Sequence, residues 1–393
     1  MAEEKDLEQE EAQQEPVDFE IENTEEMAEA PQEAQVEEDD FYANLSEDMD
    51  ERVLTSLANE LISEYKKDRE SRSDWEKSYT SGLDLLGFKY SESGQPFKGA
   101  SGVTHPLLSE AVTQFQAQAY KELLPSDGPV RTHVVGEVSP QREQQADRVK
   151  EFMNYMIMEK MEEYTPEFDQ LLFYLPLAGS SFKKIYYDSM LQRAVSKFIP
   201  AEDLVVPYYA TDLNDCERIT HVVKMTENDI LKKQKSGFYR DVNVSPSDED
   251  DEIQDKYNSM EGVERNSQYD SQYNILEMHV DLDLAEYEVD NSEKNVKVPY
   301  IVTIDEGSQE VLSIYRNFAS DDPILKRKEY FVHYKFLPGL GFYGFGLIHM
   351  IGGLSKTATA ALRQLLDAGT LSNLPAGFKS RGLRIRDDDQ PFQ

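Results

Sequence analysis

The spacing of apolar residues changes near residue 180, and this change limits the folds open to the chain. Before it, apolar residues recur every three or four positions, as amphipathic helices require. Residues 51–70 show the pattern, with one face that carries Val53, Leu54, Leu57, Leu61, Ile62 and Tyr65. After residue 180, short runs rich in β-branched and aromatic residues predict strands. The sequence therefore predicts an α+β protein in which helices come first and strands follow.

Further helices are expected before residue 180. The first continues through Trp75 to a closing Gly87, and a second lies within residues 104–125, with Thr104 as its cap. A third begins at Ser139-Pro140, and its methionines are predicted to fill a core, at positions 153, 156, 158 and 161. A fourth follows Pro166. The β-branched run VRTHVVGEV, residues 130–138, predicts a short strand.

Residues 180–337 predict a mostly antiparallel β region. SFKKIYYDSMLQRAVSKFIP indicates two strands around a turn, and six more strand-like runs follow: LVVPYY, ITHVVKM, YNILEMHVDLDL, VPYIVTID, EVLSIYRNF and YFVHYKFLP. An acidic loop, residues 245–272, interrupts them and is expected to be mobile.

The stretch GLGFYGFG, residues 339–346, allows two interpretations. Its glycines spell G-x-G-x-x-G at Gly339, Gly341 and Gly344, which a nucleotide-binding enzyme would use to hold a dinucleotide. That fingerprint belongs to a βαβ unit with a parallel strand after the helix, and no such strand follows. The favoured interpretation is a hinge that includes Gly346, in which glycines allow a sharp turn and neighbouring aromatic residues pin it.

A long helix is expected from about Leu347 to Leu371. Its apolar residues alternate spacings of four and three, which forms a heptad-like stripe suited to packing against other helices: Leu347, Ile351, Leu354, Ala358, Ala361 and Leu365. Lys356 and Arg363 share a second face, turned away from the stripe. More cations follow near the C-terminus, at Lys379, Arg381, Arg384 and Arg386.

Charge is distributed unevenly. Of the formal net charge of −37, a large part comes from residues 1–50, which hold 21 Asp or Glu and one basic residue, Lys5. This segment is predicted to be a disordered acidic tail. It is interpreted as a solvating leader, with a docking or DNA-mimicking arm as the alternative.

Several classes of site and compartment are disfavoured by the sequence. The chain has a single cysteine, Cys216, and it shows neither a signal-peptide pattern nor a long apolar run. These features predict a protein of a reducing compartment with no membrane association. Six scattered histidines and the pair Asp281 and Asp283, which is typical of a half-exposed strand, predict no metal site. With no P-loop or nucleophile motif, no enzymatic activity and no cofactor are expected.

Three stretches in order resemble the portal, or head–tail connector, proteins of tailed bacteriophages, most closely those of short-tailed phages. They are GASGVTHPLLSEAVTQFQAQAYKELLPSDGPV (99–130), AGSSFKKIYYD with FIPAEDLVVPYYATDLNDCERITH, and YGFGLIHMIGGLSKTATAALRQLLDAGTLSNLPAGF (343–378). The resemblance covers roughly residues 60–380. Together with the acidic tail predicted from composition, 1–50, it implies the following domains: 51–179, helical entry region; 180–338, α+β wing; 339–375, hinge and stem helix; and 376–393, start of the clip.

The resemblance also implies a function. Portal subunits form a ring, twelve-fold in the particle, at one capsid vertex, and double-stranded DNA enters and leaves through its centre. The implied partners are other copies of the chain, DNA bound without sequence preference, the terminase large subunit, head–tail adaptor proteins, and the major capsid or scaffolding protein. The expected location is the host cytoplasm during assembly and then the virion.

Portal chains normally continue into a second stem helix and a crown, whereas this sequence stops at RIRDDDQPFQ. A fragment of a longer reading frame, or a second polypeptide that completes it, is expected. By position, Lys356 and Arg363 are candidates for the channel side of the stem, and the four later cations lie where the clip begins.

Overall fold

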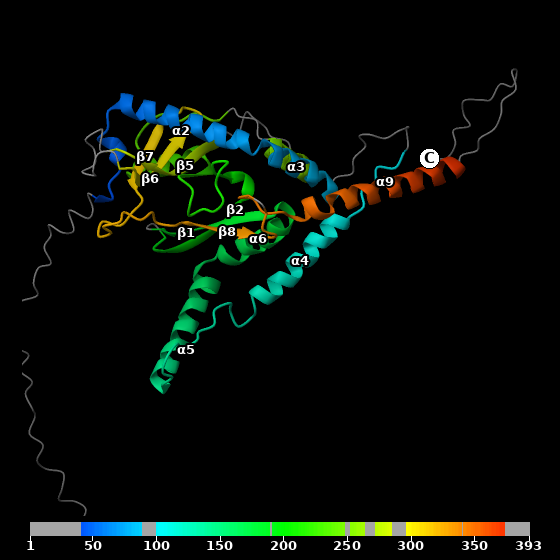
Figure 1. Cartoon of the computed structure of the whole chain (residues 1–393), viewed down its shortest axis with the longest axis horizontal. Helices are drawn as coiled ribbons and strands as arrows, with labels where there is room; N and C mark the ends of the chain where they lie inside the picture. Colours follow the sequence, from blue (N-terminus) through cyan, green and yellow to red (C-terminus); the bar gives the residue numbers. More distant parts are fainter. Residues whose placement is uncertain are drawn as a thin grey trace, which may run out of the picture. The chain divides into compact units, whose positions relative to one another are not determined.

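The computed structural model describes residues 41–88, 100–188, 191–247, 252–263, 272–284, 296–339 and 341–373. The chain divides into two units, residues 1–43 and 44–393, and only residues 41–43 of the first are described. The second unit is a mixed α+β fold (Figure 1). Residues 1–40 of the predicted acidic tail and the four C-terminal cations lie outside the described residues. Residues 41–50 are described, and the predicted disorder is wrong there, because the 3-10 turn Leu45–Glu47 is held by buried Leu45 and by the Asn44 side chain.

Helices occupy most of the described chain before residue 180, as predicted. They are α2 (Glu51–Ser71), α3 (Ser73–Leu83), α4 (Leu107–Leu123), α5 (Pro140–Tyr155) and α6 (Tyr164–Ala178). The predicted face of α2 is buried except for Val53, which is half-buried. The cap expected at Thr104 is wrong, because α4 begins after Pro106 without a side-chain cap. Gly87 closes the short 3-10 turn Asp84–Leu86 at a φ of 71°, a conformation that favours glycine.

The strands form two antiparallel sheets, which confirms the predicted β region. Sheet A has the order β2-β1-β8, and sheet B has the order β3-β4-β5-β6-β7. Their bounds are β1 (Ser180–Asp188), β2 (Arg193–Pro200), β3 (Leu204–Val205), β4 (Arg218–Met225), β5 (Tyr273–Leu282), β6 (Val298–Asp305), β7 (Val311–Arg316) and β8 (Phe331–Lys335). Each pairing within the two sheets is antiparallel.

Three local predictions are wrong. Residues 130–138 do not form a strand, because no described strand lies beside them to share hydrogen bonds. The methionines after Ser139 do not fill a core, since α5 buries none of its residues and continues into the exposed or half-buried π-helical turn Met156–Lys160. The acidic loop contains a helix, α8 (Glu252–Glu261), held by buried Ile253. A further helix, α7 (Glu227–Lys235), was not predicted.

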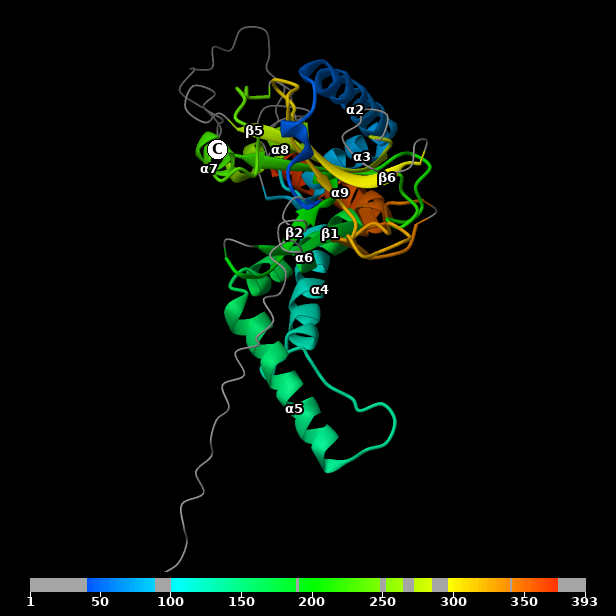
Figure 2. The same ribbon diagram turned by 90° about the vertical axis from the view of Figure 1, so that its left-hand side faces the viewer.

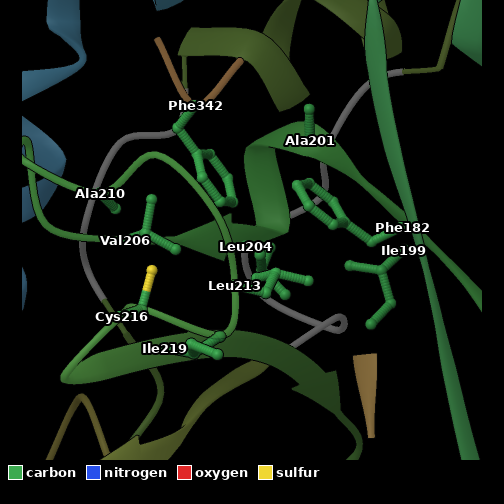
Figure 3. Packing of buried hydrophobic residues seen from close by; sticks show 10 residues of the cluster. All are labelled: Phe182, Ile199, Ala201, Leu204, Val206, Ala210, Leu213, Cys216, Ile219 and Phe342. Carbon is green, nitrogen blue, oxygen red and sulfur yellow. The ribbon is translucent and has the colours of Figure 1, made fainter. Parts of the chain in front are cut away.

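A hydrophobic cluster joins the two sheets (Figure 3). It combines Phe182 of β1, Ile219 of β4 and Phe342 of the glycine stretch, with seven further residues: Ile199, Ala201, Leu204, Val206, Ala210, Leu213 and Cys216. Phe182 and Phe342 stack with ring centroids 5.8 Å apart. Burial of one such ring stabilises a fold by about 1.5–3 kcal/mol, so the glycine stretch is fixed to both sheets by its own side chain.

The chain leaves sheet A through the glycine stretch and enters α9 (Leu347–Asn373), as predicted (Figure 1). α9 packs against α4, α6 and α3. No helix in the described part of the chain combines the length and apolar character needed to cross a bilayer.

Candidate functional site

The predicted stripe of α9 is open within the chain mainly in its C-terminal part. Leu354 and Leu365 are 64% and 72% exposed, and Ala361 is exposed as well. The remaining stripe residues, Leu347, Ile351 and Ala358, are half-buried. The buried residues of the helix lie on a different face, made of Ile348, Gly352, Ser355 and Thr359. At 3.6 residues per turn, that face lies about 100° around the helix axis from the stripe. Leu347 and Ile351 of the stripe also pack against the hydrophobic cluster that contains Ile348.

A short segment, residues 101–105, runs along α9 and is held by three of its side chains. We call it the strap. The Asp367 carboxylate accepts from the Ser101 amide (2.7 Å), and the Thr359 hydroxyl accepts from the His105 amide (3.0 Å). Between them, Arg363 donates to the carbonyl oxygen of Val103 (2.7 Å). These α9 residues are spaced by four, so they lie on successive turns of one side of the helix.

The two cations predicted on α9, Lys356 and Arg363, differ in their contacts with the strap. Arg363 is half-buried, and its guanidinium donates hydrogen bonds to strap residues. Lys356 is exposed on the side opposite the stripe, as expected. The other proposed DNA contacts, Lys379, Arg381, Arg384 and Arg386, lie outside the described residues.

The glycine stretch is held by close backbone contacts to Gly179, at the end of α6. A Cβ added at Gly346 would lie 2.2 Å from the Leu177 carbonyl oxygen, and one at Gly344 would lie 2.5 Å from that of Gly179. A Cβ at Gly339 would meet the Tyr343 carbonyl oxygen at 2.6 Å, whereas one at Gly341 would meet nothing. None of the four glycines has a positive φ. Glycine is therefore needed at three of these positions because the backbone of another segment lies too close for a Cβ. The predicted reason, a sharp turn, was different.

The amides of this stretch are already hydrogen-bonded, which opposes the dinucleotide interpretation. The Gly344 amide donates to the Ser180 hydroxyl (2.7 Å), and the Phe345 amide donates to the Leu337 carbonyl (2.9 Å). The Gly346 amide donates to Nδ1 of His349 (3.1 Å). A dinucleotide fingerprint uses such amides, at a helix N-terminus, for pyrophosphate. In addition, β8 pairs antiparallel with β1, whereas the fingerprint follows a strand of a parallel sheet.

Two of the three predicted aromatic anchors are in place. Phe342 is buried in the inter-sheet cluster, and Tyr343 stacks on Trp75 with centroids 4.9 Å apart. The Tyr343 hydroxyl also accepts from buried Arg72 (3.1 Å), which donates to the carbonyl oxygen of Leu204 (2.9 Å). Phe345, in contrast, is 40% exposed. Arg72 thus ties the α2–α3 junction to the segment that enters α9, a role with no sequence signal.

Next to Arg72, the carboxylate of Glu202 lies among tyrosines. The hydroxyls of Tyr174 and Tyr257 donate to it, the latter at 2.9 Å, and Tyr79 lies 2.8 Å from the Tyr257 hydroxyl. Burial, with a smaller contribution from the charge of Asp203, raises the pKa of Glu202 to about 7. The network joins α3, α6 and α8, and it takes up a proton near neutral pH.

Glu202 is expected to make stability depend on pH. Between the ordinary glutamate pKa of 4.5 and the folded pKa of about 7, the folded chain holds a proton on Glu202 that the unfolded chain has lost. The contribution of Glu202 therefore decreases as pH rises through that window, by up to about 1.4 kcal/mol per pH unit. Glu202→Gln cannot titrate, so the difference in unfolding free energy between the two proteins should change between pH 5 and pH 8 in urea titrations. A constant difference would contradict the assignment.

Other predicted candidates do not assemble into a site. In the described ranges, no three His, Cys, Asp or Glu side chains are placed to hold a metal ion. Asp281 is half-buried in β5, opposite Pro299 of β6, and burial raises its pKa.

No family model matches the chain, and no curated protein matches it.

Proposed function

We propose that this chain is a structural protein of the portal type. Copies of it would form a ring at a capsid vertex, through which double-stranded DNA is packaged and ejected, and the ring would offer docking surfaces to a terminase and to adaptor proteins. The proposal is supported by the sequence resemblance and by a helical entry region, an α+β region and a long helix in the order that portal subunits require.

The observation that carries the proposal is the open stripe of α9. A helix in water covers its apolar face where it can, because each buried leucine stabilises the assembly by about 1.5–3 kcal/mol. The chain packs a different face of α9 on itself and leaves Leu354 and Leu365 exposed. Copies related by a rotation axis can cover these residues through repeated contacts.

The charge of the chain fits a conduit through which DNA slides. Each neutralised phosphate strengthens binding and slows movement, so a channel needs few cations. The net charge of −37 and the exposed Lys356 on the side of α9 away from the stripe meet this need. The contact would be weak and independent of base sequence.

The double variant Leu354→Glu, Leu365→Glu tests the proposal. Two carboxylates in the stripe are expected to abolish rings seen by negative-stain microscopy and to leave monomers in sedimentation velocity, because an interface would have to bury unpaired charges. Both side chains are exposed in the single chain, so its unfolding free energy should change by less than about 0.5 kcal/mol.

Ala360→Glu, Gln364→Glu is the matched control. It adds the same charge to exposed positions of the same helix, away from the stripe. The control should assemble like the unmodified chain. Rings in the stripe variant, or a purified unmodified chain that stays monomeric at high concentration, would refute the proposal.

A further inference from the structure

Three of the four outer edges of the two sheets are closed by the chain's own side chains or backbone. Along β2, the amides of Ser196 and Phe198 donate to glutamates that precede or begin α6, Glu163 and Glu167. Along β7, the Ile314 amide donates to Asn44 (2.9 Å). Beside β3, the Leu204 carbonyl accepts from Arg72 and Tyr343. Such closure prevents unwanted pairing of edge strands.

The outer edge of β8 differs along residues 331–335. The next outward group, the Leu337 carbonyl just beyond the strand, accepts from the Phe345 amide. Pairing with β1 uses Tyr330, whose carbonyl accepts from Ile185, and Phe336, whose amide donates to Gly179. Because inward and outward groups alternate along an antiparallel strand, the backbone groups of Phe331, His333 and Lys335 point outward. In the part of the chain that the structure describes, no hydrogen bond reaches those backbone groups. All three residues are half-buried.

One segment of the same chain has the composition of a strand but pairs with none of the described strands. Residues 130–135, VRTHVV, were predicted as β and lie as irregular chain between α4 and α5 (Figure 2). Asn154 fixes the start of the segment through the amide and carbonyl of Val130 (2.9 and 3.2 Å). Gly136, with a φ of 93°, follows its end. Val135 is 89% exposed.

The segment and β8 could each present β-branched or aromatic side chains on the same face of a shared sheet. As an added strand, the segment would place Val130, Thr132 and Val134 on one face. On β8, Val332, which is 40% exposed, and half-buried Tyr334 share a face. Pairs of β-branched and aromatic residues across neighbouring strands stabilise a sheet.

We propose that residues 130–135 of one copy add as a strand to the β8 edge of the neighbouring copy. The inference rests on the proposed function, because it takes the partner to be a second copy of this chain. Each copy carries both halves of the contact, so the contact can repeat around a ring. Backbone hydrogen bonds would supply affinity, and the alternating side chains would set the register.

The chain is suited to a disulfide test. Its one cysteine, Cys216, is buried, its thiol donates to the Asp212 carbonyl (3.0 Å), and burial raises its pKa to about 11, so it reacts slowly. Val134→Cys and Val332→Cys are prepared as separate proteins and mixed under mild oxidation. A disulfide that joins the two variants can then form only between copies. Neighbouring strands bring such thiols within bonding distance.

The mixture is expected to yield disulfide-linked dimer about tenfold above either variant alone, since pairing raises the effective concentration of the two thiols. Val138→Cys is the matched control, because Val138 is 65% exposed and lies beyond Gly136. It should give no excess over background. Lys335→Pro, added to Val332→Cys, removes an outward amide that β1 does not use, so the chain should fold and the cross-link should be lost.

Assembly is measured on the same mixtures by sedimentation velocity. Oligomers without the cross-link would overturn the strand addition and leave the proposed ring intact. Monomers without the cross-link would overturn both. Equal cross-linking by Val134→Cys and Val138→Cys, or a cross-link that persists with Lys335→Pro, would also refute the strand addition.

Discussion

Replacing Gly346 with alanine is expected to destabilise the folded chain by about 3 kcal/mol, at the upper end of the range for overpacked sites. The added methyl group would lie 2.2 Å from the Leu177 carbonyl oxygen and 2.6 Å from the Gly179 nitrogen. Both are backbone atoms near the end of α6, so no side chain can rotate away to make room. Urea denaturation at neutral pH measures the loss.

Two other glycines provide matched controls, because alanine at either position is not expected to cause a comparable loss of unfolding free energy. A Cβ at Gly341 or at Gly353 would meet nothing within 4 Å. Gly341→Ala should change the unfolding free energy by less than about 1 kcal/mol, and Gly353→Ala, inside α9, should raise it by up to about 1 kcal/mol. If Gly346→Ala were as stable as Gly341→Ala, the close approach of the glycine stretch to α6 would be incorrect.

Replacing Glu277 with glutamine is expected to destabilise the chain by about 3–5 kcal/mol, the usual effect of breaking a buried ion pair. Glu277 lies on β5 of sheet B. Both of its carboxylate oxygens accept hydrogen bonds from Nζ of Lys184 in sheet A, at 2.5 Å. His279 donates to it from Nε2 at 2.8 Å. Without the carboxylate, Lys184 would be a poorly solvated cation between the two sheets.

The ion pair between Lys184 and Glu277 also predicts that stability decreases in acid. Lys184 and His279 hold the pKa of Glu277 well below its usual value, against the opposing effect of burial. A lowered pKa contributes stability above the unfolded value of 4.5, and this contribution is lost as pH falls towards the folded pKa. The deficit of Glu277→Gln should therefore be full at pH 7 and shrink below about pH 4.5.

A double variant tests whether the loss comes from the unpaired charge. Lys184→Met with Glu277→Met removes both partners, so it should recover a large part of the stability that Glu277→Gln loses. A double variant as unstable as the single one would show that packing, rather than charge, dominates at this position.

Local patterns were sufficient to predict most of the elements but not their partners. α9 was expected to end near Leu371 and ends at Asn373, and the runs after residue 180 are strands, because apolar spacing and β-branched content reflect local geometry. Residues 130–138 have the same content and form no strand. A strand also needs a neighbour, which composition does not specify.

The contacts that fix the candidate site join residues far apart in sequence. The partner of Gly346 is at residues 177–179, and that of Glu277 is Lys184, so neither spacing nor motif indicates them. The heptad pattern revealed the open stripe of α9 but not its packed face, where small residues such as Gly352 and Ser355 meet the chain. The hydrogen bonds of Arg363 to the strap have no signal in the sequence either, because their partners lie about 260 residues away.

The strap also has a mechanical consequence for α9. Asp367, Arg363 and Thr359 grip it on successive turns, so the helix cannot rotate about its own axis without breaking all three attachments together. Torque applied to α9 would be carried to α4, which follows the strap directly in sequence. Every copy of the chain would consequently present α9 at the same angle to whatever lies against it.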